Sequence, residues 1–581
     1  MYERQCTQTY PEETNDTFIG KEKNKTTMST FTPKLFTLLK NSYSSSDLRS
    51  DAIAGLTVAI VALPLAMALA IASGASPDKG LITAVIAGFL ISFLGGSRVQ
   101  IGGPTGAFVV VIFNVIAQHG YDGLILATLM AGVILLVAGY ARMGQIIKFI
   151  PHPVVTGFTA GIAVIIASSQ VKDFLGLQID TIPADFIPKW TAYFEAMDTV
   201  SMATLGIGLA ALLIIIALRR FAPKLPGYLI AVALSAVAVA LFHIPVETIG
   251  SRFPDIQTGL PLPRLPAWDF AKLQSVIPSA FTIAFLAGIE ALLSAVVADG
   301  MTGTKHRSNQ ELVGQGFANI ASSLFGGLPA TGAIARTATN IKAGAKTPMA
   351  GIFHAMFLLL FMLFAMDIMA FVPLAVLAAI LFIVAWGMSE IGHFIHIFRL
   401  SRTDRAVMVL TFLLTVLVDL TVAIGVGVTL ACLLFMKHMS ETVEIKSEWR
   451  KSKALYDEEA EYETQRHDLP KGVEVFQITG PFFFGVAADL VDTLKAMGQM
   501  PKVLILRMRL VPYLDATGES ALESVIKQCG DNGTKIILSG LQPQPLSMLK
   551  NAHIEESKTH VSFAPNYEAA LKKAKEIIHI K

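Results

Sequence analysis

Glu290 lies in the middle of an apolar stretch of this sequence, IPSAFTIAFLAGIEALLSAVVADG, where a carboxyl group is costly. A charge at the centre of a membrane helix is destabilising unless it is protonated or partnered, so such an acid marks a functional site. Because burial favours the neutral carboxyl group, we expect Glu290 to bind and release a coupling proton. Ser294, one turn later, is expected to hydrogen-bond this group or a ligand. The alternative is a protonated structural acid that bonds a neighbouring helix.

Arg336 is a second charge within an apolar region, in the sequence AIARTATN. A guanidinium behind the first turn of a helix strengthens the positive potential that an anion meets, without having to contact the anion. The alternatives are an arginine that extends to the membrane surface and one that pairs with Glu290.

Two glycine-interrupted segments resemble each other, FLGGSRVQIGGPTGAFVVVI from Phe93 and LFGGLPATGAIARTATNI from Leu324. In each, a Gly-Gly pair and irregular backbone precede a short helix that opens with Pro, Thr and Gly. Two such segments in corresponding parts of two halves indicate the binding site of a transporter. The alternative is that the glycines only permit close packing of helices.

The chemistry of these segments follows from where their helices begin. A helix that starts within the membrane leaves its first N–H groups unpaired, and its dipole adds about half a positive charge there. Such groups are tolerated only beside a cavity or a ligand. Two facing helix ends therefore predict an anion site without a full positive charge.

The composition shows which elements must position these residues. The chain has 581 residues, of which 53% are hydrophobic and 15% charged. Residues 51–438 carry 39 charges in 388 positions, whereas residues 439–581 carry 38 in 143, close to the ~25% of soluble domains. The first part therefore belongs in a membrane, which excludes a soluble enzyme. A net charge of +2 gives no indication of nucleic acid binding.

The membrane part contains about fourteen apolar runs, seven before residue 250 and seven after. The two interrupted segments are the third run of each half, and several runs are too short for the ~20 residues of a spanning helix. We therefore expect a polytopic α-helical membrane protein with 14 transmembrane segments in a 7+7 inverted repeat, with half-helices 3 and 10. The runs lie near 52–73, 79–95, 104–118, 122–143, 153–169, 202–218, 227–244, 277–298, 311–326, 332–344, 348–366, 371–388, 403–419 and 420–438.

Lys and Arg occur in alternate connections between the runs, which predicts that both termini are cytoplasmic. Two long connections on the opposite side are exceptions, and they include Lys172, Lys189, Arg252, Arg264 and Lys272.

The flanking regions are expected to be a disordered arm over residues 1–45, a linker over 439–470 and a cytoplasmic domain over 471–581, after a transport domain over 46–438. In the tail, 473–480, 502–509 and 534–540 are predicted strands, and 486–498, 516–530, 544–552 and 567–579 are predicted helices. Asp515 and Thr517 lie at the turn before the second of these helices, which Thr517 is expected to cap.

Other chemistries find no support in the sequence. Cys6, Cys432 and Cys529 are too far apart to indicate a disulfide framework or a metal site. His393 and His396 indicate a juxtamembrane basic face rather than a metal site. No G-x-S-x-G or H-E-x-x-H pattern occurs, and no cofactor other than a coupling ion is expected.

Residues 45–581 resemble the sulfate permease (SulP) family, relatives of the mammalian solute carrier 26 anion transporters. The resemblance rests on AGLTVAIVALPLAMALA at 54–70, GGSRVQIGGPTGAF at 95–108, VADGMTGTKHRSNQELVGQG at 297–316, GAIARTATNIKAGAKTP at 332–348 and LDATG in the tail. It implies core and gate domains, elevator-like alternating access, a homodimer and a C-terminal α/β STAS domain with a possible cytoplasmic partner. The segment after residue 300 is most similar to bacterial members that carry C4-dicarboxylates with protons. The resemblance therefore implies the bacterial inner membrane as the location.

Carried over by position, the resemblance implies a substrate site at Leu65, Leu69, Thr105, Gly106, Ala107, Ala333, Ile334 and Ala335, with Arg336 behind it. Leu65 replaces a glutamine of several relatives, and Ala333 and Ala335 replace serines, so the pocket relies more on backbone donors. Glu290 falls where some members have a proton-coupling acid and sodium-coupled members have Asp. In the STAS turn, D-A-T-G leaves Thr517 as the residue with a phosphorylatable hydroxyl.

These observations together predict a secondary transporter in contact with membrane lipid, which moves a small anion by proton symport, with sodium as the alternative coupling ion. A dicarboxylate such as fumarate or succinate, or sulfate, is the expected substrate. A bicarbonate or chloride transporter, an uncoupled anion channel and a signalling scaffold remain alternatives.

Overall fold

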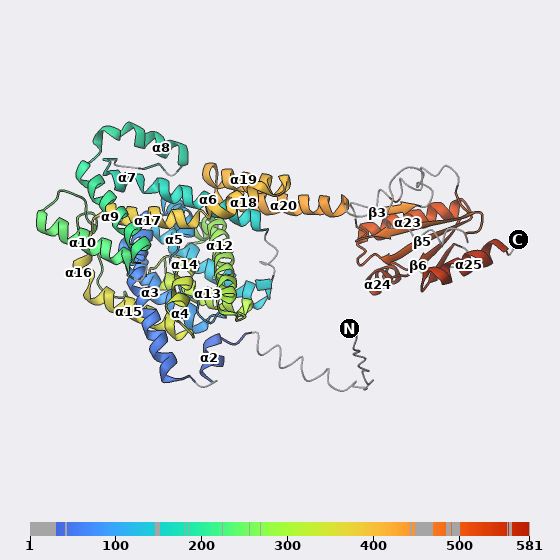
Figure 1. Cartoon of the computed structure of the whole chain (residues 1–581), viewed down its shortest axis with the longest axis horizontal. Helices are drawn as coiled ribbons and strands as arrows, with labels where there is room; N and C mark the ends of the chain where they lie inside the picture. The colour runs from blue at the N-terminus through green and yellow to red at the C-terminus, as the bar shows by residue number, and fades with distance from the viewer. Residues whose placement is uncertain are drawn as a thin grey trace, which may run out of the picture. The chain divides into compact units, whose positions relative to one another are not determined.

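The structure is a computed structural model that divides the chain into two compact units, Met1–Val428 and Thr429–Lys581. Each unit is described by itself (Figure 1). The described residues are 31–40, 43–145, 151–179, 182–183, 185–222, 225–254, 256–267, 269–441, 444–447, 469–483, 490, 500–554, 556 and 560–579.

The first unit is helical, and every apolar run expected from the sequence lies on a helix. The main helices of the first half are α3 Ser45–Ala72, α4 Pro77–Leu94, α5 Val109–Tyr140, α6 His152–Ser169, α9 Met202–Phe221 and α10 Gly227–Phe242. The third and fourth runs are joined in α5, which is interrupted by the non-helical backbone of Gly120 at φ 70° and ψ 179°. Shorter connecting helices are α7 Val171–Leu175, α8 Phe186–Glu195 and α11 Ile249–Arg252.

The second half follows the same order. Its main helices are α12 Phe270–Thr302, α13 Ser308–Leu324, α14 Ile334–Lys342, α15 Met349–Phe364, α17 Leu374–Met388, α19 Arg402–Leu417 and α20 Leu420–Glu441, with the short α16 Met366–Met369 and α18 Ile391–Arg399. With nine residues, α14 is far too short to cross a bilayer core of about 30 Å. Eight helices among the described residues are long and apolar enough to span a membrane.

The helices form two packed groups, and each group draws on both halves of the unit. Helices α3, α4, α5, α12, α13, α14 and α15 pack against one another and are called the core group. Helices α6, α9, α10, α17 and α19 form the gate group. Because α5 packs on α13 and α3 on α15, the two halves interlock within the core group.

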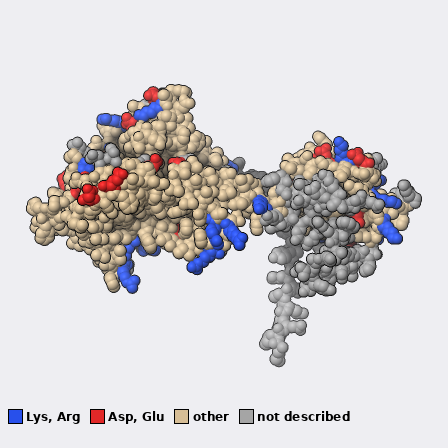
Figure 2. Space-filling model, turned by 90° about the horizontal axis from the view of Figure 1, so that it is seen from above, with Lys and Arg blue, Asp and Glu red and all other residues tan. Residues whose placement is uncertain are grey.

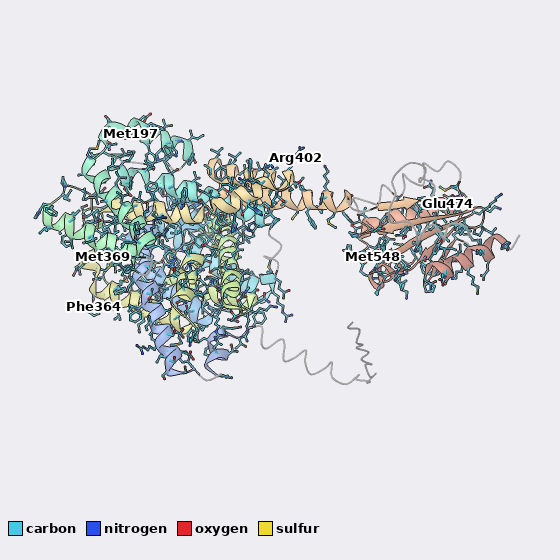
Figure 3. The ribbon with its side chains drawn as sticks, viewed as in Figure 1. Met197, Phe364, Met369, Arg402, Glu474 and Met548 are labelled. Carbon is cyan, nitrogen blue, oxygen red and sulfur yellow. The ribbon has the colours of Figure 1, made fainter. Side chains whose placement is uncertain are left out.

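The outer surface of this unit is apolar. Large hydrophobic side chains such as Leu213 (66% exposed), Trp386 (70%) and Phe364 (79%) would be unusual on the surface of a soluble protein in such numbers. Figure 2 shows a face with few charged side chains, and Figure 3 shows Phe364 near the end of α15. The unit is therefore built to contact lipid.

The expectation of disorder through residue 45 is wrong for residues 34–39, which form helix α2, Lys34–Leu39. Its backbone and side chain reach the membrane unit, because the Lys34 amide donates to the Gly95 carbonyl (3.0 Å) and its Nζ to the Lys305 carbonyl (2.8 Å). Leu35 is 3% exposed, so packing of an apolar side chain fixes the helix. Residues 1–30 of the expected arm lie outside the described residues.

The second unit is an α/β domain built on a five-stranded sheet in the order β3-β4-β5-β6-β7. Its strands are β3 Glu444–Ser447, β4 Val473–Thr479, β5 Val503–Leu510, β6 Lys535–Ser539 and β7 Val561–Ala564, with helices α23 Ala516–Asp531, α24 Pro543–Asn551 and α25 Tyr567–His579. Strand β3 is antiparallel to β4, and the other neighbours are parallel.

Two details of this domain differ from expectation. Strand β3 lies within the expected linker, because four of its residues pair with β4. Helix α23 is capped by Asp515 rather than Thr517: the Asp515 carboxylate accepts a 2.7 Å hydrogen bond from the Gly518 amide, and Thr517 is exposed. The predicted helix 486–498 lies outside the described residues, apart from the buried Leu490.

Candidate functional site

The two glycine-interrupted segments meet in the core group. Gly102–Gly103 (β1) pairs antiparallel with Thr331–Gly332 (β2), and the Ala333 amide donates to the Ile101 carbonyl at 2.8 Å. A Cβ on Gly332 would lie 1.4 Å from Nε2 of Gln100, so a larger residue there would displace this buried side chain from its hydrogen bond to the Ala291 carbonyl. Two segments that are distant in the sequence are therefore in contact through their backbones at this crossing.

Immediately after the crossing, each segment turns into a helix whose first N–H groups have no partner. Thr105 and Ala333 are the extended residues that precede the helical turns, and neither side chain caps its helix. Of the described residues, none accepts a hydrogen bond from the amides of Gly106, Ala107, Ile334 or Ala335. The geometry is that of two helix N-termini open to an anion.

Glu290 lies on α12 beside the first of these helix ends. The Thr105 hydroxyl donates a 2.8 Å hydrogen bond to Oε2 of Glu290. The carboxyl group thus touches a residue at the start of the half-helix rather than a remote structural partner. The carboxyl group therefore lies at the helix end that faces the cavity.

Arg336 is 4% exposed and does not extend to the surface. Its Nη2 donates to the Pro104 carbonyl, while Nη1 has no partner among the described residues. Gly103, at φ 147°, makes room for this side chain, since a Cβ there would lie 2.6 Å from Nη1. No ion pair joins Arg336 to Glu290 within the described residues, so its charge is left to act on the site.

Ser294 does not line the cavity, and its hydroxyl does not bond Glu290. It is fully buried, and its hydroxyl donates to Oγ1 of Thr337 at 3.2 Å. Thr337 Oγ1 in turn accepts from the Ile101 amide at 3.1 Å. The expected contact with the carboxyl group is therefore absent, because this turn of α12 faces α14 and supports the strand crossing instead.

One cavity of about 330 Å³ lies between the core and gate groups and brings the predicted residues together. Glu290 lines it, and Ser294 does not. The other predicted residues all line it: Leu65, Leu69, Thr105, Gly106, Ala107, Ala333, Ile334, Ala335 and Arg336.

The cavity also has lining residues that the sequence did not indicate. Thr159 on α6, Tyr228 on α10 and Thr339 on α14 add hydroxyl groups, Glu390 adds a second acid, and Arg219 adds a second arginine. Glu390 contacts Nδ1 of His393 at 3.3 Å and has a left-handed backbone. It directly follows an apolar run, where acids are common, so its position in the chain carried no signal.

Two buried carboxylates outside the cavity hold the interrupted segments in place. Glu311 accepts from the amides of Gly96 (2.8 Å) and Ser97 (3.0 Å), just before β1. Asp51 accepts from the amides of Lys346 (2.7 Å) and Thr347 (3.1 Å), just after α14. Both were missed as functional candidates, because their partners lie more than 200 residues away. Among the described residues no group of three His, Cys, Asp or Glu side chains could hold a metal ion.

Comparison with known proteins decides the family. Residues 48–411 match the model of the sulfate permease family, and residues 466–570 match that of the STAS domain. The chain belongs to the sulfate permease family. It is a multi-pass membrane anion transporter with a C-terminal STAS domain, and it is not an enzyme.

Relatives from bacteria cover nearly the whole chain. It is 42% identical to YvdB of Bacillus subtilis (strain 168), provisionally named a sulfate transporter, over 87% of this chain and 94% of that protein. It is 33% identical to the bicarbonate transporter BicA of Picosynechococcus sp. (strain ATCC 27264 / PCC 7002 / PR-6), over 92% of this chain and 96% of that protein.

Two solved structures show the same fold. Murine solute carrier 26 family member A9, described as an anion transporter in the inward-facing state, superposes with a TM-score of 0.83 at 18% identity and covers 98% of this chain and 100% of that one. The transmembrane domain of a cyanobacterial BicA gives a TM-score of 0.59 at 33% identity, over 67% of this chain and 98% of that one. The predicted polytopic fold with a STAS domain is confirmed.

Proposed function

We propose that the protein is a proton-coupled symporter of a small anion, which binds in the cavity between the core and gate groups. The observation that carries this proposal is the hydrogen bond from Thr105 to Glu290 at the open N-terminus of the half-helix. It joins the acid that would carry the proton to the backbone donors that would bind the anion.

The charge of Glu290 explains how binding of the anion and binding of the proton would be coupled. When Glu290 is ionised, its negative charge offsets the positive potential of Arg336 and the helix ends, and it repels an anion. When Glu290 is protonated, this positive potential is available to the anion. By linkage, the anion then favours protonation as much as protonation favours the anion.

The cavity lining supports an anion that has an apolar part. Ten of its 23 lining residues are leucine, isoleucine, valine, methionine or phenylalanine, and four carry a hydroxyl group. A C4-dicarboxylate such as fumarate or succinate fits this balance of charged ends and hydrocarbon. Sulfate stays a candidate because of the similarity to YvdB.

A second candidate is bicarbonate, because BicA shares 33% identity with almost the whole chain. For a bicarbonate transporter, sodium is the alternative to the proton as coupling ion. Glu290 would then bind either the sodium ion or the proton. An uncoupled channel for chloride or another anion is the remaining possibility in the same cavity.

Transport would proceed by an elevator-like movement of the core group against the gate group. Both termini would lie in the cytoplasm of a bacterium, where the STAS domain would bind a cytoplasmic partner. The orientation rests on the Lys and Arg residues of alternate connections. The homodimer is proposed from the family resemblance.

Uptake into proteoliposomes tests the function. Fumarate, succinate, sulfate, bicarbonate and chloride are offered in turn, with and without an imposed pH gradient. Accumulation of one anion above its external concentration, driven by the gradient, is expected. Equilibration without accumulation would indicate a channel, and the absence of any flux would contradict transport.

A further inference from the structure

A second, smaller cavity of about 120 Å³ lies apart from the central one. It has room for several waters or one small anion, since one water needs only ~10–15 Å³. Its wall comes from the end of α3, the start of α5, the end of α6 and helices α7, α8 and α11. No lining residue is shared with the central cavity.

Two polar side chains of α8 line this cavity without a hydrogen-bond partner. Lys189 is 5% exposed, and within the described residues its ammonium group makes no hydrogen bond or ion pair. Tyr193, one turn later, is 2% exposed, and its hydroxyl has no partner there either. Because buried charges and hydroxyl groups are normally paired, both groups indicate a missing ligand.

Lys189 differs from the other two basic residues that line the cavity, Lys172 and Arg252, because each of those has a hydrogen-bond partner. Arg252 is neutralised by Asp173 at 2.9 Å and by Glu247 at 2.5 Å. The Nζ of Lys172 donates to the Ile179 carbonyl at 2.6 Å. The Lys189 ammonium instead lies 5.5 Å from the centre of the Phe113 ring, a cation–π contact that leaves its donors open.

Burial lowers the pKa of the Lys189 amine, against a smaller opposing effect of Asp185. An anion in the cavity would favour the charged amine and recover part of the cost of burying it. A cation in the same place would increase that cost. The chemistry of the cavity therefore selects an anion.

The position of the cavity relates it to transport. Phe113 and Asn114 of α5 line it, and they follow Gly106 of the central cavity by about 12 Å along the helix axis, at 1.5 Å per residue. Lys172 on α7 and Lys189 on α8 belong to a long connection on the side opposite the predicted cytoplasmic face. Figure 3 shows Met197, just after α8, at the outer edge of the membrane unit.

We propose that this cavity is a second anion site, which receives the transported anion on the face of the membrane opposite the termini. The Lys189 ammonium and the Tyr193 hydroxyl are its donors. This site rests on the proposed transport function, and it is distinct from the central site that Glu290 and Arg336 serve.

The test compares transport from the two sides of the membrane. Right-side-out and everted vesicles take up labelled sulfate, bicarbonate and fumarate, each offered in turn. We expect Lys189→Gln to raise KM about fivefold or more from the face of α8, and Tyr193→Phe about two- to threefold, with KM from the opposite face unchanged. Lys189→Arg should restore most of the affinity, because it keeps the charge.

Arg264→Gln is the matched control, because it removes one positive charge from an exposed position on the same side, outside the cavity. An unchanged KM in both Lys189→Gln and Tyr193→Phe would overturn the second site while leaving transport intact. So would a KM that rises by the same factor from both faces of the membrane, or by the same factor in the Arg264→Gln control. A wild-type protein that transports none of the anions would contradict the proposed function itself.

A measurement on the wild-type protein avoids any folding defect of the variants. Acylation of the Lys189 amine by a membrane-impermeant reagent is followed by mass spectrometry. A transported anion should slow this labelling at least several-fold, whereas the labelling rate of Lys272, a more exposed native amine on the same side, should not change. Equal rates with and without the anion would contradict the proposal.

Discussion

The Thr105 hydroxyl donates a 2.8 Å hydrogen bond to the carboxyl group of Glu290, and so joins the start of the first half-helix to the first long helix of the second half. The two residues are 185 positions apart in the chain. This contact thus connects the two halves of the membrane unit at the point where anion and proton would both bind.

Removing the Arg336 side chain should weaken anion binding. Its unpartnered Nη1 lies behind the open helix end, so Arg336→Ala is expected to raise the KM for the anion about tenfold or more, with a smaller effect on protein yield. Arg98→Ala serves as the control, since that guanidinium bonds the Lys346 carbonyl outside the cavity. An unchanged KM in Arg336→Ala would leave Arg336 a purely structural role.

Ser294→Ala should lower stability and spare proton coupling. The substitution removes the hydrogen bond to Thr337, at a cost of about 0.5–1.5 kcal/mol. Thermal unfolding in detergent should show a lower melting temperature, while uptake keeps its dependence on the pH gradient. Loss of that dependence would mean that Ser294 acts in coupling after all.

Glu311→Gln should destabilise the approach to β1. The carboxylate accepts from two backbone amides and from Nε2 of Gln315 at 2.9 Å, and hydrogen bonds to a charged group each contribute about 1.5–3 kcal/mol. We expect a lower melting temperature and faster hydrogen exchange of the Gly96 and Ser97 amides. Hydrogen-exchange rates of these amides equal to those of the wild-type protein would show that the bonds to Glu311 do not stabilise this segment.

In the STAS domain, Asp515→Ala should cost about 1 kcal/mol through loss of the helix cap, whereas Thr517→Ala should be nearly neutral. Hydrogen exchange of the Gly518 amide in the full-length protein distinguishes the two. A larger loss of stability in Thr517→Ala than in Asp515→Ala would show that Thr517 caps the helix.

The parts of the site that depend on local sequence could be predicted. The breaks at Gly102–Gly103 and Thr331–Gly332 interrupt apolar runs visibly, and Glu290 and Arg336 are conspicuous within them. These signals need no knowledge of the fold, because a polar group within a membrane has few alternative roles.

The parts of the site that the sequence did not predict depend on contacts between segments that are distant in the chain. Spacing alone placed Ser294 on the face of Glu290, but the neighbouring helix decides which partner a side chain meets, and here that partner is Thr337. Thr159 and Tyr228 reach the cavity only because the gate group packs against the core group. Lys189 looked like an ordinary loop charge until the structure showed it buried.

Glu290→Gln tests the central claim most directly, with Glu390→Gln as the matched control for the loss of one cavity acid. The measurement is uptake of the anion that the wild-type protein accumulates, in proteoliposomes at a series of imposed pH gradients. We expect Glu290→Gln to equilibrate or exchange the anion without accumulating it, at every gradient, while the control still responds to the gradient. Accumulation by Glu290→Gln with wild-type dependence on the pH gradient would contradict the role of Glu290 as carrier of the coupling proton.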